Sequence, residues 1–126
     1  MTKNKRETGD IGEEAVAGFL EHSGYEILER NYTVRGGEID IIARKDGTLC
    51  FVEVKTRRAN ALVSGEKALT PKKRGFIIKT ADIYYRRYKK EHGEMKCRFD
   101  VASVVLENGK IQKVKYYVAA FDASGI

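Results

Sequence analysis

The chain has 126 residues, of which 42% are hydrophobic and 33% are charged, and its formal net charge is +6. A chain of this length forms one ordinary domain, so we expect residues 1–126 to fold as a single unit. The composition excludes a disordered chain, and no apolar run approaches the ~20 residues that a membrane helix needs. The basic N-terminus lacks the apolar stretch of a secretion signal. We therefore expect a cytoplasmic globular protein without a membrane anchor.

The first predicted element is a helix over residues 11–23, with Gly24 at the position of a C-cap glycine. Glu13 lies three, four and seven residues before the apolar residues of this helix and shares their inward stripe, whereas Glu14 falls on the outer face. Because an unpaired buried carboxylate is costly, an acid at position 13 is unusual. The apolar residues of the stripe are Val16, Ala17 and Leu20.

Strand signals follow the helix. Residues 25–32 are predicted to be extended, and Gly36-Gly37 breaks the chain before a β-branched strand over residues 38–43. Asp46-Gly47 is a strong signal for a two-residue hairpin turn, and we expect the returning strand over residues 48–56.

The second half begins with residues 57–69, which show no clear period and are predicted to form a basic loop. Thr70 caps a second helix, Pro71 takes its first position, and the helix runs to about Tyr88. Two strands and a second hairpin signal complete the chain: residues 98–106, Asn108-Gly109 and residues 110–119. This order predicts an α/β or α+β protein with helices packed on a mixed sheet.

The first hairpin places charged residues together. A two-residue turn at Asp46-Gly47 sets Asp40 opposite Glu53 and Glu38 opposite Lys55. Such paired residues project to one face with Cβ atoms about 4.5–5.5 Å apart, and residues two apart on a strand share a face. We therefore expect one patch of these four residues. The apolar face of the two strands is predicted to consist of Ile39, Ile41, Val52 and Val54.

Two carboxylates at this distance repel each other, and one should stay protonated unless a cation lies between them. Mg²⁺ prefers oxygen ligands and is typically held by one or two carboxylates plus a substrate phosphate. The patch therefore indicates Mg²⁺- or Mn²⁺-dependent phosphodiester hydrolysis, with Lys55 neutralising charge on the phosphate or on the attacking hydroxide. The alternative is ordinary charged decoration on a solvent-facing strand. Phe51 and Ile42 disfavour it, because they partly cover the charged face.

These residues also carry a family resemblance. The runs Gly37–Asp40 and Phe51–Arg57 resemble the PD-(D/E)XK nuclease signature, an acid followed after a gap by acid-x-Lys. The whole chain resembles the bacterial YraN-like family, also called UPF0102. The matching positions are Gly9, Gly12, Glu13, Gly37–Asp40, Val52–Arg57, Lys73 and Arg98–Val101.

The resemblance implies a restriction-endonuclease-like fold, with a mixed β-sheet flanked by helices, similar to archaeal Holliday-junction resolvases. It implies that Asp40 and Glu53 bind the metal and that Glu13 supports it from the first helix. It leaves open a homodimer, by analogy with the resolvases. The family is largely uncharacterised, so the resemblance implies fold and site more strongly than substrate.

Positive charge is concentrated in residues 55–90, which contain twelve Lys and Arg against two acids. Such a field attracts a polyanion, and helix N-termini bind phosphate. We therefore expect nucleic acid, DNA in the first instance, as the partner, although an exposed basic helix turn remains the alternative. The residues expected to bind nucleic acid are Arg57, Lys72, Lys73 and Arg74.

Other conspicuous side chains are given structural roles. Cys50 and Cys97 lie in apolar or strand-like runs and are expected to be reduced thiols. Asp100 is expected to pair with a basic residue rather than to take part in catalysis. The helix tyrosines are expected in the core and on the helix surface rather than stacked on bases: Tyr84, Tyr85 and Tyr88.

The resulting hypothesis is a metal-dependent endonuclease that acts on DNA, at branched or otherwise structured sites. Two alternatives belong to other classes: a non-catalytic nucleic-acid-binding protein that keeps the fold, and an accessory factor whose acidic patch is vestigial. Metal-dependent cleavage separates the first hypothesis from both alternatives. Salt-sensitive binding without cleavage favours the binding protein.

Overall fold

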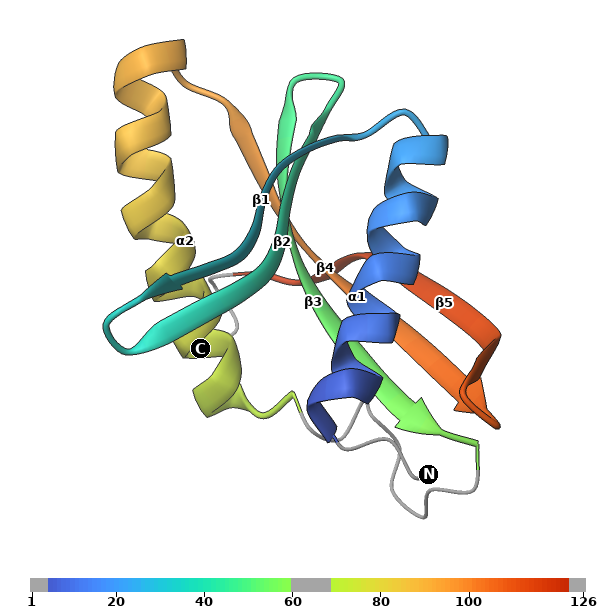
Figure 1. Ribbon diagram of the computed structural model, residues 1–126. Coiled ribbons are helices and arrows are strands. Elements are labelled where there is room, and N and C mark those ends of the chain that lie inside the picture. Colours follow the sequence, from blue (N-terminus) through green and yellow to red (C-terminus); the bar gives the residue numbers. More distant parts are fainter. Residues whose placement is uncertain (1–4, 60–68, 123–126) are drawn as a thin grey trace.

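A computed structural model of the protein describes residues 5–59 and 69–122 (Figure 1). Within these residues the chain forms two helices and five strands. In chain order they are α1 (Lys5–His22), β1 (Glu26–Val34), β2 (Gly37–Lys45), β3 (Thr48–Arg58), α2 (Pro71–His92), β4 (Lys96–Glu107) and β5 (Lys110–Phe121).

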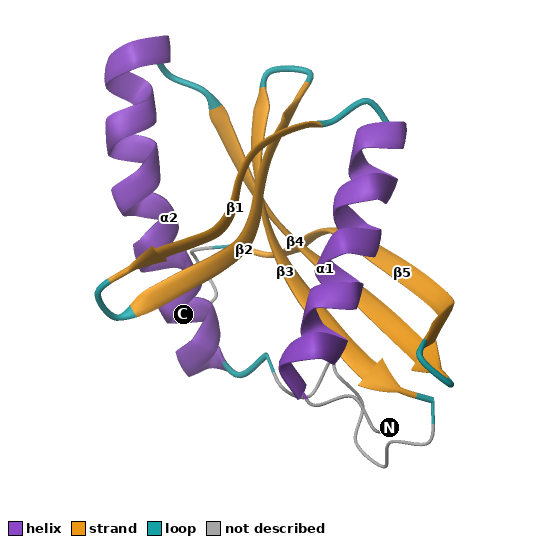
Figure 2. Cartoon of the chain, in the orientation of Figure 1, coloured by secondary structure: helices purple, strands orange, loops and turns teal. Residues whose placement is uncertain are grey.

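The strands form one mixed sheet in the order β1-β2-β3-β4-β5. Neighbouring strands are antiparallel except β3 and β4, which are parallel and are connected through α2. The two helices lie on opposite sides of the sheet (Figure 2). The predicted class is confirmed: the protein is α/β, with a mixed sheet flanked by helices, consistent with a restriction-endonuclease-like fold. In the described ranges, no helix is long and apolar enough to cross a membrane.

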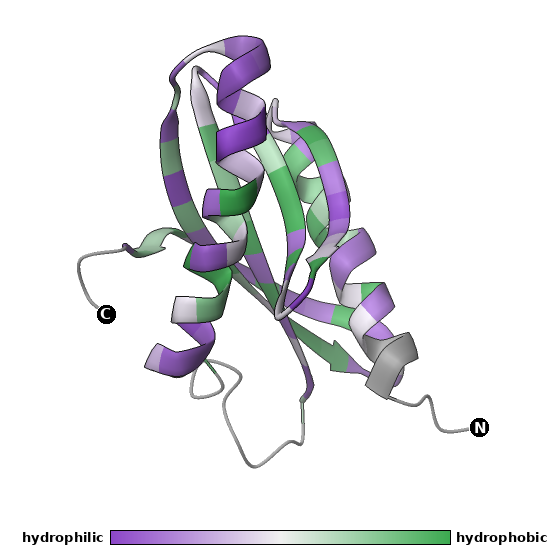
Figure 3. Cartoon of the chain, turned by 90° about the vertical axis from the view of Figure 1, so that its left-hand side faces the viewer, coloured by the Kyte–Doolittle hydropathy of each residue, from purple (hydrophilic) through white to green (hydrophobic). Residues whose placement is uncertain are grey.

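Each face of the sheet has its own apolar core. Figure 3 shows hydrophobic positions running along the strands that lie between the helices. The core under α1 contains Val16, Ala17, Leu20, Ile41, Ala43, Cys50, Val52, Val54, Ala102, Val104 and Leu106. The core under α2 contains Ile39, Ile42, Leu49, Phe51, Ile77, Ala81 and Tyr88.

The predicted apolar face of the first hairpin, which is formed by β2 and β3, is wrong at one residue. Ile39 packs in the α2-side core, whereas Ile41, Val52 and Val54 pack in the α1-side core. Strict alternation would keep Ile39 and Ile41 on the same side of β2. The alternation therefore breaks at Asp40, the residue between them, and this break lies at the candidate site.

Both predicted hairpin turns are confirmed. Asp46 and Gly47 have φ of 48° and 73°, and Asn108 and Gly109 have φ of 52° and 75°. Positive φ at both central residues is the hallmark of the tight turn that Asx-Gly sequences favour. The register that follows from the first turn is confirmed for five residue pairs, from Lys45–Thr48 to Ile41–Val52.

The helices are longer than predicted. α1 begins at Lys5 rather than at residue 11, and Gly24 follows it with φ of 88° as expected. At α2 the predicted cap is confirmed, because the Thr70 hydroxyl accepts the Lys73 N–H at 3.2 Å. The helix continues past Tyr88 to His92.

The predicted loop over residues 57–69 begins later than expected, because β3 continues through Arg57 to Arg58. The part of that loop over residues 60–68 lies outside the described residues. Cys50 and Cys97 are free thiols, as expected; Cys50 is buried and Cys97 is exposed.

Candidate functional site

The site begins where β2 and β3 part. Their ladder ends at Ile41 and Val52, one position before Asp40 and Glu53 would pair. Beyond that point the Val54 N–H donates to Oδ2 of Asp40 at 2.8 Å. A side-chain carboxylate thus takes the backbone donor that a neighbouring strand would otherwise accept. The main chain of β3 therefore fixes the position of the Asp40 carboxyl group.

Glu53 meets Asp40 as the register predicts, although through side chains rather than through a continued ladder. The two carboxyl groups share a hydrogen bond, and the Glu53 side chain is only 15% exposed. Burial, the hydrogen bond and the negative charge of Asp40 raise the pKa of Glu53 to about 8. The pair consequently holds a proton near neutral pH, as expected for adjacent carboxylates without a cation between them.

Lys55 lies on the same side of β3, with its Nζ 3.7 Å from Oε1 of Glu53. Its side chain is 20% exposed, so the ammonium group is partly withdrawn from water while remaining accessible. The lysine charge lowers the pKa of Glu53, but burial and Asp40 outweigh it. One ammonium group therefore does not neutralise the acidic side of the site.

Glu13 reaches the site from α1. Its Oε1 is buried and has no hydrogen-bond partner among the described residues. Burial and then the negative charge of Asp40 raise the pKa of Glu13 to about 7, against the opposing effect of Arg30. The neighbouring Glu14 is 76% exposed and pairs with Arg30 at 2.8 Å. The predicted helix phase, with Glu13 inward and Glu14 outward, is confirmed.

Two glycines allow the helices to approach the site strands closely. A Cβ atom at Gly12 would overlap the Thr56 hydroxyl group of β3, and a Cβ atom at Gly37 would overlap the Thr80 hydroxyl group of α2. Such close approach is a physical reason for glycine at a helix–strand contact. The first contact brings α1, and with it Glu13, against the strand that carries Glu53 and Lys55.

The carboxyl groups suit a hard divalent cation. A cation between Asp40 and Glu53 would relieve the repulsion that contributes to the raised pKa of Glu53. Over residues 5–59 and 69–122, no group of three or more His, Cys, Asp or Glu side chains is close enough to hold a metal. Mg²⁺ commonly uses one or two carboxylates with water and phosphate, so Asp40 and Glu53 are the fitting pair.

The predicted nucleic-acid-binding residues lie in β3 and in the first turn of α2. Lys72 and Lys73 are exposed in the first turn of α2, which contains no acid, whereas Arg74 is partly buried. Arg57 follows Lys55 two residues along β3. The Nε of Arg74 is buried without a hydrogen-bond partner in the described part of the chain.

Sequence reasoning missed a cavity beside Lys55. Its walls include Val101 of β4 and Tyr117, Ala120 and Phe121 of β5. These strands reach the site through the parallel pairing of β3 with β4, which no local sequence signal indicates. The cavity is described further below.

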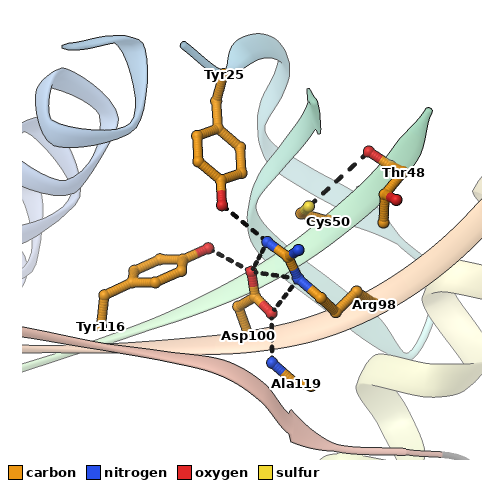
Figure 4. A network of polar contacts seen from close by, with 7 residues as sticks. All are labelled: Tyr25, Thr48, Cys50, Arg98, Asp100, Tyr116 and Ala119. Carbon is orange, nitrogen blue, oxygen red and sulfur yellow. Dashed lines mark hydrogen bonds and ion pairs between the residues drawn. The ribbon is translucent and has the colours of Figure 1, made fainter. Parts of the chain in front are cut away.

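Asp100 forms a separate buried network (Figure 4). Arg98 Nε donates to its Oδ1 at 2.9 Å, the Tyr116 hydroxyl donates to Oδ2 at 2.6 Å, and the Ala119 N–H donates to Oδ1 at 2.9 Å. Arg98 also donates to the Tyr25 hydroxyl at 2.8 Å. The expectation that Asp100 pairs with a basic residue is confirmed.

The tyrosines of α2 also have the expected structural role. Tyr88 is buried in the α2-side core, and Tyr84 and Tyr85 are partly buried against it. The Tyr85 hydroxyl accepts the Met95 N–H at 3.1 Å.

Comparison with known proteins identifies the family. The sequence profile of the family described as "Uncharacterised protein family UPF0102" matches residues 12–104. A UPF0102 protein of Syntrophomonas wolfei is 43% identical over 116 residues, covering 92% of this chain and 98% of the relative. Another, from Dictyoglomus thermophilum, is 41% identical over 119 residues, covering 94% and 99%. The matched segment contains the acids and the lysine of the candidate site, and the chain belongs to the UPF0102 family.

Proposed function

We propose that this protein is a divalent-metal-dependent endonuclease that hydrolyses phosphodiester bonds in DNA, with branched or otherwise structured DNA as its substrate. The observation that supports the proposal is the Asp40–Glu53 carboxyl pair, which retains a proton although Lys55 lies 3.7 Å away. A carboxyl pair that keeps a proton at neutral pH can release that proton when a cation binds between the two groups.

Each residue has a part in this chemistry. Asp40 and Glu53 would hold the metal, and Glu13 would support it from α1. Bound Mg²⁺ or Mn²⁺ would lower the pKa of a water molecule and polarise the scissile phosphate. The Val54 N–H donates a hydrogen bond to Asp40 and thereby orients its carboxyl group. The Lys55 ammonium neutralises charge that develops on the phosphate or on the attacking hydroxide.

A cleavage screen tests the proposal. Linear, nicked, flapped and four-way DNA are incubated with the protein and Mg²⁺ or Mn²⁺. We expect cleavage of at least one structured substrate. Asp40→Asn should abolish it while preserving or tightening binding, because removing the negative charge reduces repulsion of the phosphate. Lys55→Ala should also abolish cleavage but weaken binding.

Asp82→Asn is the matched control for Asp40→Asn, since Asp82 lies on the exposed side of α2 and pairs with Arg86 at 3.0 Å. This variant should cleave like the wild type. Cleavage that survives both Asp40→Asn and Lys55→Ala would show a contaminating nuclease and would remove the support for the proposal.

The adjacent acids of α1 offer a second matched pair. Glu13→Gln should lower the apparent affinity for Mg²⁺, whereas Glu14→Gln should leave it unchanged, because Glu14 is 76% exposed and faces away from the site. Titration of cleavage rate against metal concentration measures both. Equal effects of the two substitutions would argue against a role for Glu13 at the metal.

A second candidate function is binding of nucleic acid without cleavage. The first turn of α2 favours it independently, because this turn has exposed cations and no acid. Each phosphate contact contributes about 0.9 to the log–log salt slope of the binding constant. Joint replacement of Lys72 and Lys73 by Ala should flatten that slope, with Lys89 and Lys90 at the other end of α2 as the control pair. Salt-sensitive binding with no cleavage of any substrate would select this candidate.

A further inference from the structure

A cavity of about 320 Å³ opens beside the candidate site. Its lining residues come from three strands, from the first turn of α2 and from the segment just before that helix: Lys55, Leu69, Arg74, Val101, Tyr117, Ala120 and Phe121. The volume is at the lower end of the range for small-molecule pockets, so the cavity suits one compact group rather than a chain.

The register of the sheet connects this cavity to the carboxyl pair. Glu53 of β3 pairs with Val101 of β4, and Val101 pairs with Tyr117 of β5. Lys55 belongs to both places, because it contacts Glu53 at 3.7 Å and also lines the cavity. A group that enters the cavity while Lys55 contacts a phosphate therefore lies close to that phosphate.

One wall of the cavity is formed by the last ring of a row of stacked aromatic side chains. Phe51, Phe99 and Phe121 face one another across β3, β4 and β5, with centroids 5.5 and 5.1 Å apart and interplanar angles of 28° and 22°. Phe121 is the last ring of this row and lines the cavity. A flat aromatic group placed there has a ring to stack on.

Another lining residue supplies an unused hydrogen-bond donor. The Nε of Arg74 is buried and has no partner among the residues that the structure describes, although Arg74 lines the cavity. Leaving a buried N–H group of a cation unpaired is costly. An acceptor inside the cavity would relieve that cost.

We propose that this cavity receives an unstacked nucleobase of the strand that is cut, at or next to the scissile nucleotide. The inference rests on the proposed function and adds the substrate class. A nucleobase has the flat aromatic face that Phe121 can stack against and the ring and carbonyl acceptors that Arg74 can contact. Its phosphate then falls beside Lys55.

The consequence is selectivity for strands with unpaired nucleotides. A base in a duplex must first leave its stack and its pair before it can enter the cavity, whereas a base in a flap, a mismatch or a single strand is already free. The protein should therefore select a local lack of pairing rather than a sequence.

Binding without metal tests the inference separately from catalysis. Fluorescence anisotropy with EDTA present compares a single-stranded oligothymidylate with an abasic oligomer of equal length. The two strands carry the same phosphate charge, so any difference in affinity comes from the bases. We expect the wild type to prefer the strand with bases by about tenfold, the scale of one base–aromatic stacking contact.

Ala120→Trp fills the cavity and should abolish this preference while leaving affinity for the abasic strand unchanged. Val118→Trp is the matched control: it lies two residues earlier on β5, is 56% exposed and should keep the preference. A preference that persists in Ala120→Trp, or equal wild-type affinity for the two strands, would overturn the inference. Loss of the preference in Ala120→Trp but not in Val118→Trp would support the inference about the cavity. If the wild-type protein showed this result but cleaved no substrate, the nuclease proposal alone would be refuted.

Discussion

Two groups of buried carboxyl side chains lie at β3 and at its neighbour β4, and they differ in how fully hydrogen bonds and cations compensate their burial. Asp100 is fully buried, and its oxygens accept hydrogen bonds from Arg98, Tyr116 and Ala119. It pairs in register with Val52, immediately before Glu53. Because successive residues of a strand face opposite sides, these neighbouring positions belong to different environments.

In the second centre, which consists of Glu13, Asp40 and Glu53, hydrogen bonds and cations compensate only part of the cost of burying the carboxyl groups. The pKa values of Glu13 and Glu53 are raised, and the buried Oε1 of Glu13 lacks a hydrogen-bond partner within the described ranges. Burial of a carboxylate is tolerated where partners neutralise it, and Asp100 meets that condition. The contrast indicates that Asp100 stabilises the fold, whereas burial of Glu13 and Glu53 in the second centre lowers stability when both are ionised.

The largest expected effect on stability is at the Asp100 network. Arg98→Ala leaves the Asp100 carboxylate buried without its cation and should lower the free energy of unfolding by about 3–5 kcal/mol. Urea denaturation monitored by circular dichroism measures this loss. The variant that remains folded at low temperature should still bind Mg²⁺. A loss below about 1 kcal/mol would mean that Asp100 is less dependent on Arg98 than the contrast requires.

A smaller effect is expected at Tyr116, whose hydroxyl donates to Asp100 at 2.6 Å. Tyr116→Phe removes a hydrogen bond to a charged group and should cost about 1.5–3 kcal/mol. Tyr85→Phe is the control, because the Tyr85 hydroxyl accepts a bond from an uncharged N–H at 3.1 Å and its loss should cost about 0.5–1.5 kcal/mol. Thermal unfolding of both variants gives the comparison, and equal losses would contradict it.

At the second centre the expected effect depends on pH and has the opposite sign. The pKa of Glu53 is raised from 4.5 to about 8 in the folded protein. Its contribution to stability is therefore present below about pH 4.5 and is lost as the pH rises through about 8. Glu53→Gln lacks this loss and should be more stable than the metal-free wild type above pH 8.

Added Mg²⁺ should reverse that order, because only the wild type supplies both carboxylates. Unfolding temperatures at several pH values, with EDTA and with Mg²⁺, test both statements. A Glu53→Gln variant that is less stable than the wild type in EDTA above pH 8 would place Glu53 in the same class as Asp100.

The predictable part of this molecule is the part that short-range chemistry determines. Asp46-Gly47 sets a tight turn, and its register brings Asp40 to Glu53. Helical spacing places Glu13 inward and Glu14 outward. The resemblance to a known family added the expectation that Glu13 supports a metal, whereas spacing alone only marked Glu13 as unusual.

The remainder depends on long-range packing. The change of face between Ile39 and Ile41 follows from packing against two different helices, and a simple alternation rule cannot show it. The cavity needs β5 beside β4 and β4 beside β3, together with positive φ at Ala119, which interrupts the alternation of β5 just before Ala120 and Phe121. No local signal in residues 110–119 indicated those positions.

The parallel pairing of β3 and β4 also has a consequence for synthesis of the chain. β1, β2 and β3 are sequential antiparallel strands that can pair as soon as they leave the ribosome, but β4 follows only after all of α2. Until then the apolar edge of β3 lacks its partner, and an open edge of this kind pairs readily with other chains. Expression of a chain that stops after α2 should therefore give aggregates. Slow translation through α2 should lengthen the interval in which a nascent chain needs a chaperone.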